Sequence, residues 1–181
     1  FGELVFTHFG LSGPLILSAS AHMRRFGERA YHLEIDLKPA LEEPALDRRL
    51  LSDFEKYRNQ DFCNALDDLL PKKLIPEVVR ISEIEPRRKV HDVTREQRRG
   101  LLQILKHFPV VIAGPCPVTD AIVTSGGVSV KEIDPATMES RRVRGLYFAG
   151  ELIDVDAYTG GFNLQIAWST GRAAGLAAAS A

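Results

Sequence analysis

The residues best suited to chemistry lie near the end of the sequence, where Gly150 and Glu151 follow an apolar run and Gly160 and Gly161 open a segment of helical period. The first N–H groups of a helix lack intrahelical acceptors, and the helix dipole adds partial positive charge. Two glycines there let an anion or an electron-rich carbonyl approach the backbone. A carboxylate at a strand's carboxyl end, the position expected for Glu151, can accept hydrogen bonds from sugar-like hydroxyls. Tight helix packing or a solvated loop acid explains each feature alone, but together they predict a ligand site.

Strands and helices must position these residues. Alternation of apolar and polar residues predicts a half-buried strand over 31–37. Ser12 and Pro14 are helix-start residues and predict a short helix over 15–23, and a closing helix is predicted over 161–179. Further short strands are predicted at 110–112, 121–123, 128–133 and 145–150. The last of these is expected to be buried and to end on Gly150, directly before the candidate site.

Residues 41–107 have a different composition, which is charged, poor in glycine and helical in period. Leu46, Leu50 and Phe54 begin a series of apolar residues at three- and four-residue steps. Thr94 and Gln97 have the spacing of a capping box. We therefore predict a helical subdomain of about four helices whose charged faces are solvated.

Composition excludes several classes of function. The 181 residues carry 23 basic and 24 acidic side chains, and this balance gives no reason to expect a nucleic-acid partner. Short basic clusters such as 87–89 are interpreted as solvated surface. Two distant cysteines and five scattered histidines predict neither a disulfide framework nor a metal site, and they favour a reducing cytoplasm. No apolar run is long enough to span a membrane, so no membrane partner is expected.

Several motifs resemble the C-terminal signature of the aminoacetone-oxidase-like and 3-dehydro-bile-acid-reductase-like FAD enzymes, a family of flavoproteins with two dinucleotide-binding domains. They occur in the family's order along the chain. The matching stretches are 7–14, 123–128, 131–135, 137–140, 145–151 and 159–165.

This resemblance implies an α+β fold in which a β-rich, substrate-side domain (1–40 and 108–130) carries the helical subdomain (41–107). Residues 131–181 would then form the strand–loop–helix end of a Rossmann-like FAD domain. It also implies residues that contact FAD. These are Gly150, Glu151, Gly160, Gly161, Phe162, Asn163 and Leu164.

By the same resemblance Thr124, Gly126 and Gly127 lie on the substrate side near the flavin. His8, which borders a glycine-rich turn, is a candidate acid or base, although a structural histidine is the commoner explanation. Tyr158 is a weaker candidate. No residue identifies itself as catalytic from the sequence, and NAD(P)H is considered as a reductant of the flavin.

Such an enzyme needs a GxGxxG turn for the pyrophosphate, and this sequence contains none. We therefore expect a fragment whose partner is the N-terminal half of the FAD domain, and which is inactive alone. The parent is expected to be an oxidoreductase that transfers hydride to or from a small organic substrate. The alternative is a non-catalytic substrate cap or interaction module.

Overall fold

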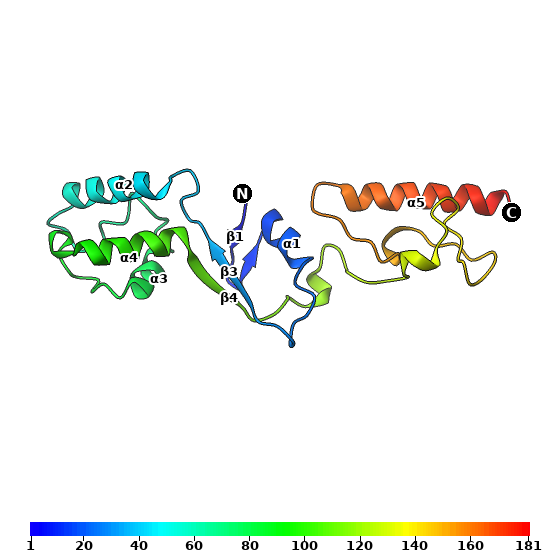
Figure 1. The fold of residues 1–181 in the computed structure, drawn as a ribbon, viewed down its shortest axis with the longest axis horizontal. Helices are drawn as coiled ribbons and strands as arrows, with labels where there is room; N and C mark the ends of the chain where they lie inside the picture. Colours follow the sequence, from blue (N-terminus) through cyan, green and yellow to red (C-terminus); the bar gives the residue numbers. More distant parts are fainter. The chain divides into compact units, whose positions relative to one another are not determined.

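The computed structural model describes residues 1–181 and divides into two compact units. One unit comprises Ala30–Ala113, and the other combines Phe1–Arg29 with Gly114–Ala181. The chain is mixed α/β, with five α-helices and two small antiparallel sheets (Figure 1). Each unit is described by itself.

The unit 30–113 consists of a β-ribbon and a helical body. Strand β3 (Tyr31–Ile35) pairs antiparallel with β4 (Phe108–Ile112), so that Leu33 lies opposite Val110. Side chains of β3 alternate between half-buried and exposed, as the sequence predicted for this segment. The β4 run was also predicted from its β-rich residues.

Three α-helices, α2 (Glu43–Lys56), α3 (Ile75–Ser82) and α4 (Arg95–Lys106), form the helical body (Figure 1). The predicted capping box is confirmed, because the Thr94 hydroxyl accepts from Gln97 N–H while the Gln97 side chain accepts from Thr94 N–H. This arrangement satisfies two donors that the helix itself leaves unpaired. Helix α4 therefore begins where the sequence placed it.

The core of this unit is built by the predicted apolar period. Leu46, Leu50, Phe62, Val78, Leu101 and Leu105 are fully buried. Burying each such side chain contributes about 1.5–3 kcal/mol. Asp53 is the one buried charged residue, and its carboxylate accepts two hydrogen bonds from Arg49 at 2.9 and 2.8 Å.

The helical subdomain, predicted to hold about four helices, has three α-helices, because residues 59–73, which include Phe62 and Leu66, form turns. Phe62 N–H donates to Arg88 O (2.9 Å) and Cys63 N–H donates to Pro86 O (3.1 Å). These backbone groups therefore bond to a distant segment instead of to a helical turn. The apolar side chains are buried as predicted, although the backbone is not helical.

The second unit begins with the short strands β1 (Val5–Phe6) and β2 (Leu11–Ser12), which pair antiparallel, and helix α1 (Pro14–Ser20). Its longest element is α5 (Phe162–Ala179), close to the predicted 161–179. Three 3₁₀ turns complete it: η2 (Val118–Asp120), η3 (Val130–Glu132) and η4 (Gly150–Leu152). Turn η4 packs against α5 (Figure 1). A small core of Ile133, Met138, Ile153 and Ala174 packs α5 against the turns of residues 128–153.

The strands predicted at 121–123, 128–133 and 145–150 are wrong. Residues 121–123 form no ladder, and 128–133 contain a 3₁₀ turn with single bridges at either end. Residues 145–150 make one antiparallel bridge, Glu139↔Tyr147, and Leu146 is 42% exposed, so the expected burial is also wrong. A strand needs a neighbour that pairs along its length, and these segments have only isolated contacts.

A Rossmann-like domain over 131–181 is not established by the fold, because this stretch contains a helix and turns but no parallel sheet. One isolated parallel bridge, Val128↔Ile153, reaches this stretch. The predicted domain boundaries remain predictions.

Candidate functional site

The N-terminus of α5 is open for a ligand. Its N-cap, Gly161, has φ +87° and Gly160 has φ +123°, values that L side chains rarely adopt. The first intrahelical bond runs from Gln165 N–H to Gly161 O at 3.0 Å. The N–H groups of Phe162, Asn163 and Leu164 have no acceptor within the chain. They are the donors that a helix start presents to an anion or a carbonyl.

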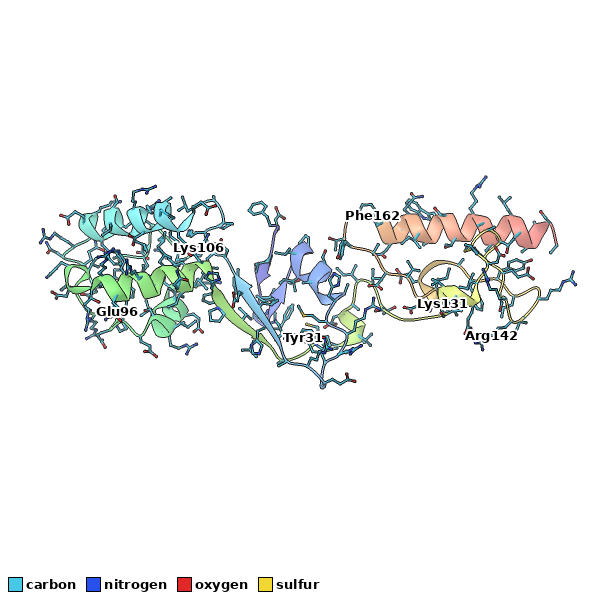
Figure 2. The ribbon with its side chains drawn as sticks, in the orientation of Figure 1. Tyr31, Glu96, Lys106, Lys131, Arg142 and Phe162 are labelled. Atoms are coloured by element: carbon cyan, nitrogen blue, oxygen red, sulfur yellow. The ribbon has the colours of Figure 1, made fainter.

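Glycine keeps this helix start clear. A Cβ on Gly161 would meet no atom within 4 Å, so a side chain there would extend into open space above the N–H groups. A Cβ on Gly160 would lie 3.3 Å from the Phe162 ring. Phe162, at the first position of α5 (Figure 2), is 60% exposed and Leu164 is 56% exposed. The helix start thus combines backbone donors with exposed apolar side chains.

Asn163 fixes the loop before the glycines. Its Nδ2 donates to Ala157 O, and its Oδ1 accepts from Ala157 N–H, both at 2.8 Å. This paired amide contact holds the loop against the first turn of α5. The side chain of Asn163 is therefore used for structure, and its backbone N–H is left for a ligand.

Gly150 is anchored on the same helix. Its φ is +66°, and its N–H donates to the Thr170 hydroxyl at 3.0 Å. A Cβ at this position would lie 3.8 Å from the Ala167 Cβ, so the small residue on α5 permits the close approach. Glu151 follows in η4 with an exposed side chain that makes no hydrogen bond or ion pair within the chain.

Gly127 lies against the segment that follows Glu151. Val128 N–H donates to Leu152 O, and Asp154 N–H donates to Val128 O, both at 2.9 Å. A Cβ on Gly127 would lie 2.4 Å from Leu152 O, a contact that real Cβ atoms do not make. The structure therefore brings the predicted substrate-side residue Gly127 beside the predicted cofactor turn. Thr124 and Gly126 precede it and are exposed.

His8 is not joined to these residues. It lies in the turn between β1 and β2, is exposed, and contacts the Phe9 ring edge-on at a centroid distance of 5.0 Å. No hydrogen bond of its side chain connects it to the α5 turn.

Sequence reasoning missed a contact between the end of α1 and the loop before α5. His22 Nε2 lies 2.7 Å from the Tyr158 hydroxyl, and Arg24 Nη2 lies 2.6 Å from Asp156 Oδ1. These pairs are separated by 136 and 132 positions. No motif marks His22 or Arg24, so only the fold reveals them.

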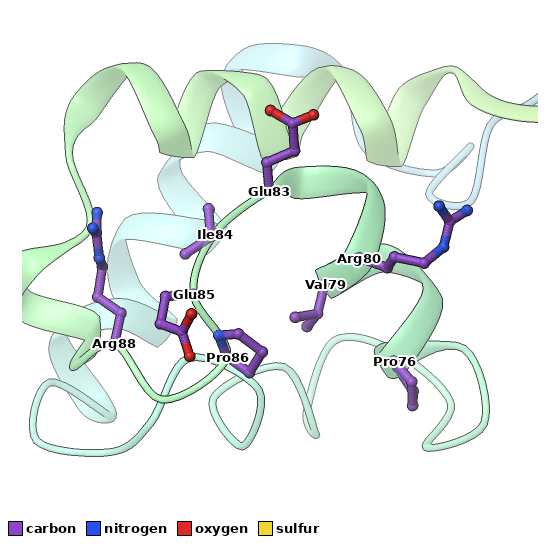
Figure 3. A pocket seen from close by; sticks show the side chains of 8 residues that line it. All are labelled: Pro76, Val79, Arg80, Glu83, Ile84, Glu85, Pro86 and Arg88. Atoms are coloured by element: carbon purple, nitrogen blue, oxygen red, sulfur yellow. The ribbon is translucent and has the colours of Figure 1, made fainter.

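The unit 30–113 contains a shallow groove of about 450 Å³ between α3 and the segment after it (Figure 3). It is lined by Pro76, Val79, Arg80, Glu83, Ile84, Glu85, Pro86 and Arg88. The Arg80 guanidinium pairs with Glu77, and this hydrogen bond lowers the pKa of the Glu77 carboxyl. Arg88 donates to Gln97 Oε1 at 2.9 Å, so both arginines already have partners.

No set of three or more His, Cys, Asp and Glu side chains is arranged to hold a metal ion. None of the helices has both the length and the apolar character needed to cross a membrane.

Residues 1–123 match a family model described as the HI0933-like protein barrel and H2TH domain. The chain is 32% identical to the 3-dehydro-bile acid delta(4,6)-reductase of Clostridium scindens over 98% of its own length and 44% of that protein. It is 35% identical to the ribosomal RNA dihydrouridine synthase of Escherichia coli over 93% of its length and 40% of that protein. The Haemophilus influenzae enzyme of the same name is 32% identical over 97% of this chain and 42% of that protein. The chain thus spans less than half the length of these relatives.

Proposed function

Because the chain belongs to the HI0933-like protein family, we propose that it is part of a flavin-dependent oxidoreductase that reduces a carbon–carbon double bond conjugated to a carbonyl group. The family and the reductase relative support a flavin-type oxidoreductase. FAD as the flavin, NAD(P)H as its reductant and the kind of double bond are the finer parts of this proposal.

The names of the relatives support the reduction of a conjugated double bond as the proposed reaction. One name describes a reductase acting at the 4 and 6 double bonds of a 3-dehydro, that is 3-oxo, bile acid. The other describes the formation of dihydrouridine, which is uridine with a saturated C5–C6 bond. In both molecules the double bond is conjugated to a carbonyl group, either directly or through a second double bond. A chain that is similar to both over more than nine-tenths of its length is best explained by this shared chemistry.

The site residues fit the ring edge of a flavin. Three backbone N–H groups at the start of α5 can donate to the electron-rich pyrimidine edge, and open space over Gly161 admits a planar ring. Glu151 has a free, exposed carboxylate that can accept from ribityl hydroxyls. The chain has no GxGxxG turn, so its residues do not account for binding of the diphosphate.

The bound flavin would supply the hydride to the substrate. The part assigned to this chain is to bind and to stabilise charge. The partial positive charge at the start of α5 favours negative charge on the ring edge, as backbone donors do in an oxyanion hole. The Asn163 side chain keeps the helix start in place by its contact with Ala157. The Thr170 hydroxyl keeps Gly150 in place by accepting a hydrogen bond from the Gly150 N–H.

The alternative, a non-catalytic cap or interaction module, applies to the 181-residue chain by itself. We propose that this chain alone retains little or no flavin, because one half of the binding groups is not in its sequence. Incubation with FAD, desalting and an absorbance spectrum test this point. A retained flavin spectrum would show that these residues suffice.

The activity is tested on the natural gene product. The flavin is reduced anaerobically with dithionite, and its reoxidation is followed after addition of 2-cyclohexenone, a minimal conjugated enone, or of ribosomal RNA from a strain that lacks the gene. Reoxidation by the enone alone supports a small-molecule reductase, and dihydrouridine in the RNA supports a ribosomal RNA substrate. No reoxidation with either probe would reject the proposal.

A further inference from the structure

A tyrosine–histidine pair lies directly before the glycine turn of α5. The Tyr158 hydroxyl and His22 Nε2 are 2.7 Å apart, and the two ring centroids are 5.7 Å apart. Tyr158 is 54% exposed and His22 is exposed. The hydroxyl is therefore hydrogen-bonded to an imidazole, whose ring nitrogens can donate or accept a proton, and it remains accessible to an incoming molecule.

Neighbouring contacts fix the position of Tyr158. The preceding residue, Ala157, is held on both its N–H and its C=O by Asn163. Asp156 is paired with Arg24 at 2.6 Å, and its side chain is only 14% exposed. Tyr158 thus stands between an anchored loop and the start of α5, where the flavin edge is proposed to bind.

We propose that Tyr158 is the proton donor of the reduction and that His22 is the positioning residue that returns its proton, an inference that rests on the proposed function. Reducing a conjugated double bond adds hydride to the β-carbon and a proton to the α-carbon. With reduced flavin as the hydride source, the π electron pair moves to the α-carbon and takes the proton of the Tyr158 O–H. The resulting phenolate takes the Nε2 proton of His22 in its imidazolium form, and the neutral imidazole that remains regains a proton from solvent. One hydride and one proton are added in total.

The contact is poorly explained as a structural tie alone. The Arg24–Asp156 ion pair already joins the same two segments. An additional hydrogen bond between two exposed side chains adds little stability in water. Within the two segments, 21–25 and 154–158, the charged side chains outside this ion pair are Arg25 and Asp154. Proton transfer by a positioned side chain contributes about 10²–10⁴-fold to rate, which gives the pair a measurable role.

The first test needs no flavin and uses the 181-residue chain labelled with ¹³Cζ-tyrosine and with histidine carrying ¹⁵N in its ring. Tyr158→Phe assigns the Tyr158 signal, and it should also shift the ring ¹⁵N signals of His22. His22→Ala should shift the ¹³Cζ signal of Tyr158. Tyr147→Phe, which removes a hydroxyl without a hydrogen bond, is the matched control and should move neither signal. Absence of both shifts would show that Tyr158 and His22 do not form a hydrogen bond, and it would overturn the proposal.

The second test measures reoxidation of the reduced gene product by 2-cyclohexenone and by ribosomal RNA from the deletion strain. Tyr158→Phe should slow reoxidation by at least about 100-fold, with flavin content unchanged. His22→Ala should slow it less, and added imidazole should restore the rate, which it would not do for a purely structural residue. A fully active Tyr158→Phe protein would overturn this inference while leaving the proposed function intact. A wild-type protein that neither probe oxidises would overturn both.

Discussion

Replacing Gly127 by alanine should destabilise the unit that contains α5 far more than replacing its neighbour Gly126. Both glycines have positive φ, +137° and +112°. They differ in what a Cβ would meet, because Gly126 has no atom within 4 Å and Gly127 has Leu152 O at 2.4 Å. The pair therefore separates backbone strain from steric conflict.

The magnitude follows from these contacts. Holding an L residue at such a φ costs about 1–3 kcal/mol, and both variants incur this cost. Ordinary contact begins at 3.4 Å, so in Gly127→Ala the Leu152 carbonyl must move by about one ångström. That movement strains the two hydrogen bonds of Val128, each worth about 0.5–1.5 kcal/mol. We expect Gly127→Ala to lower the free energy of unfolding by about 2–3 kcal/mol more than Gly126→Ala.

Trp168 provides the assay, since it is the only tryptophan and lies within α5. Its fluorescence during urea denaturation reports the unfolding of this unit, whereas far-UV circular dichroism also includes the helices of residues 30–113. The difference corresponds to a change of about 30- to 150-fold in the unfolding equilibrium constant. Equal midpoints for the two variants would refute the close approach of Gly127 to Leu152.

Three further predictions follow from the structure. Gly161→Val in the natural gene product should strip most of the flavin, because a β-branched side chain resists the +87° φ and fills the open space over the helix start; purification with full flavin content would contradict the assignment. Leu101→Ala should cost the unit 30–113 about 2–5 kcal/mol, since Leu101 is fully buried; thermal denaturation would be compared with that of Leu51→Ala, whose parent side chain is 45% exposed. The hydrogen bond from Arg98 lowers the pKa of the Asp47 carboxyl, so its stabilising effect is present above the unfolded-state pKa and is lost as the pH falls below about 4; Asp47→Asn should weaken this acid dependence in urea titrations, by less than about 1 kcal/mol because the pair is partly exposed.

The local sequence pattern predicted α2, α4 and α5 well, but it did not reveal the turns of residues 59–73, and it predicted strands that do not form. Helices α2, α4 and α5 carry their own hydrogen bonds, so a local pattern and the Thr94 cap are sufficient to predict them. A strand depends on a partner, and β3 has one in β4. Residues 121–123 and 145–150 have a β-rich composition but no neighbouring strand that pairs along their length. Composition alone therefore predicted strands that do not form.

The candidate site was predictable to the same limited extent. Glycine pairs and the helix start are local features, and the structure shows positive φ at Gly150, Gly160 and Gly161. The residues that hold them in place, such as Thr170, do so through side chains whose partners no motif specifies. His22 and Tyr158 are 136 positions apart, and only the folded chain brings them together. The predicted cofactor contacts themselves stay predictions.

The two kinds of contact in the site also indicate how one scaffold can serve different substrates. The turns at Gly127, Gly150 and Gly161 are held by backbone groups and by the close approach of small residues, which does not depend on an exposed side chain. Exposed residues such as Phe162 and Leu164 can change without disturbing these turns. Relatives named for a bile acid and for ribosomal RNA match this chain over at least 93% of its length. If the proposed function holds, we expect the backbone of the site to serve the proposed hydride transfer, and the apolar side chains exposed around it to determine the substrate.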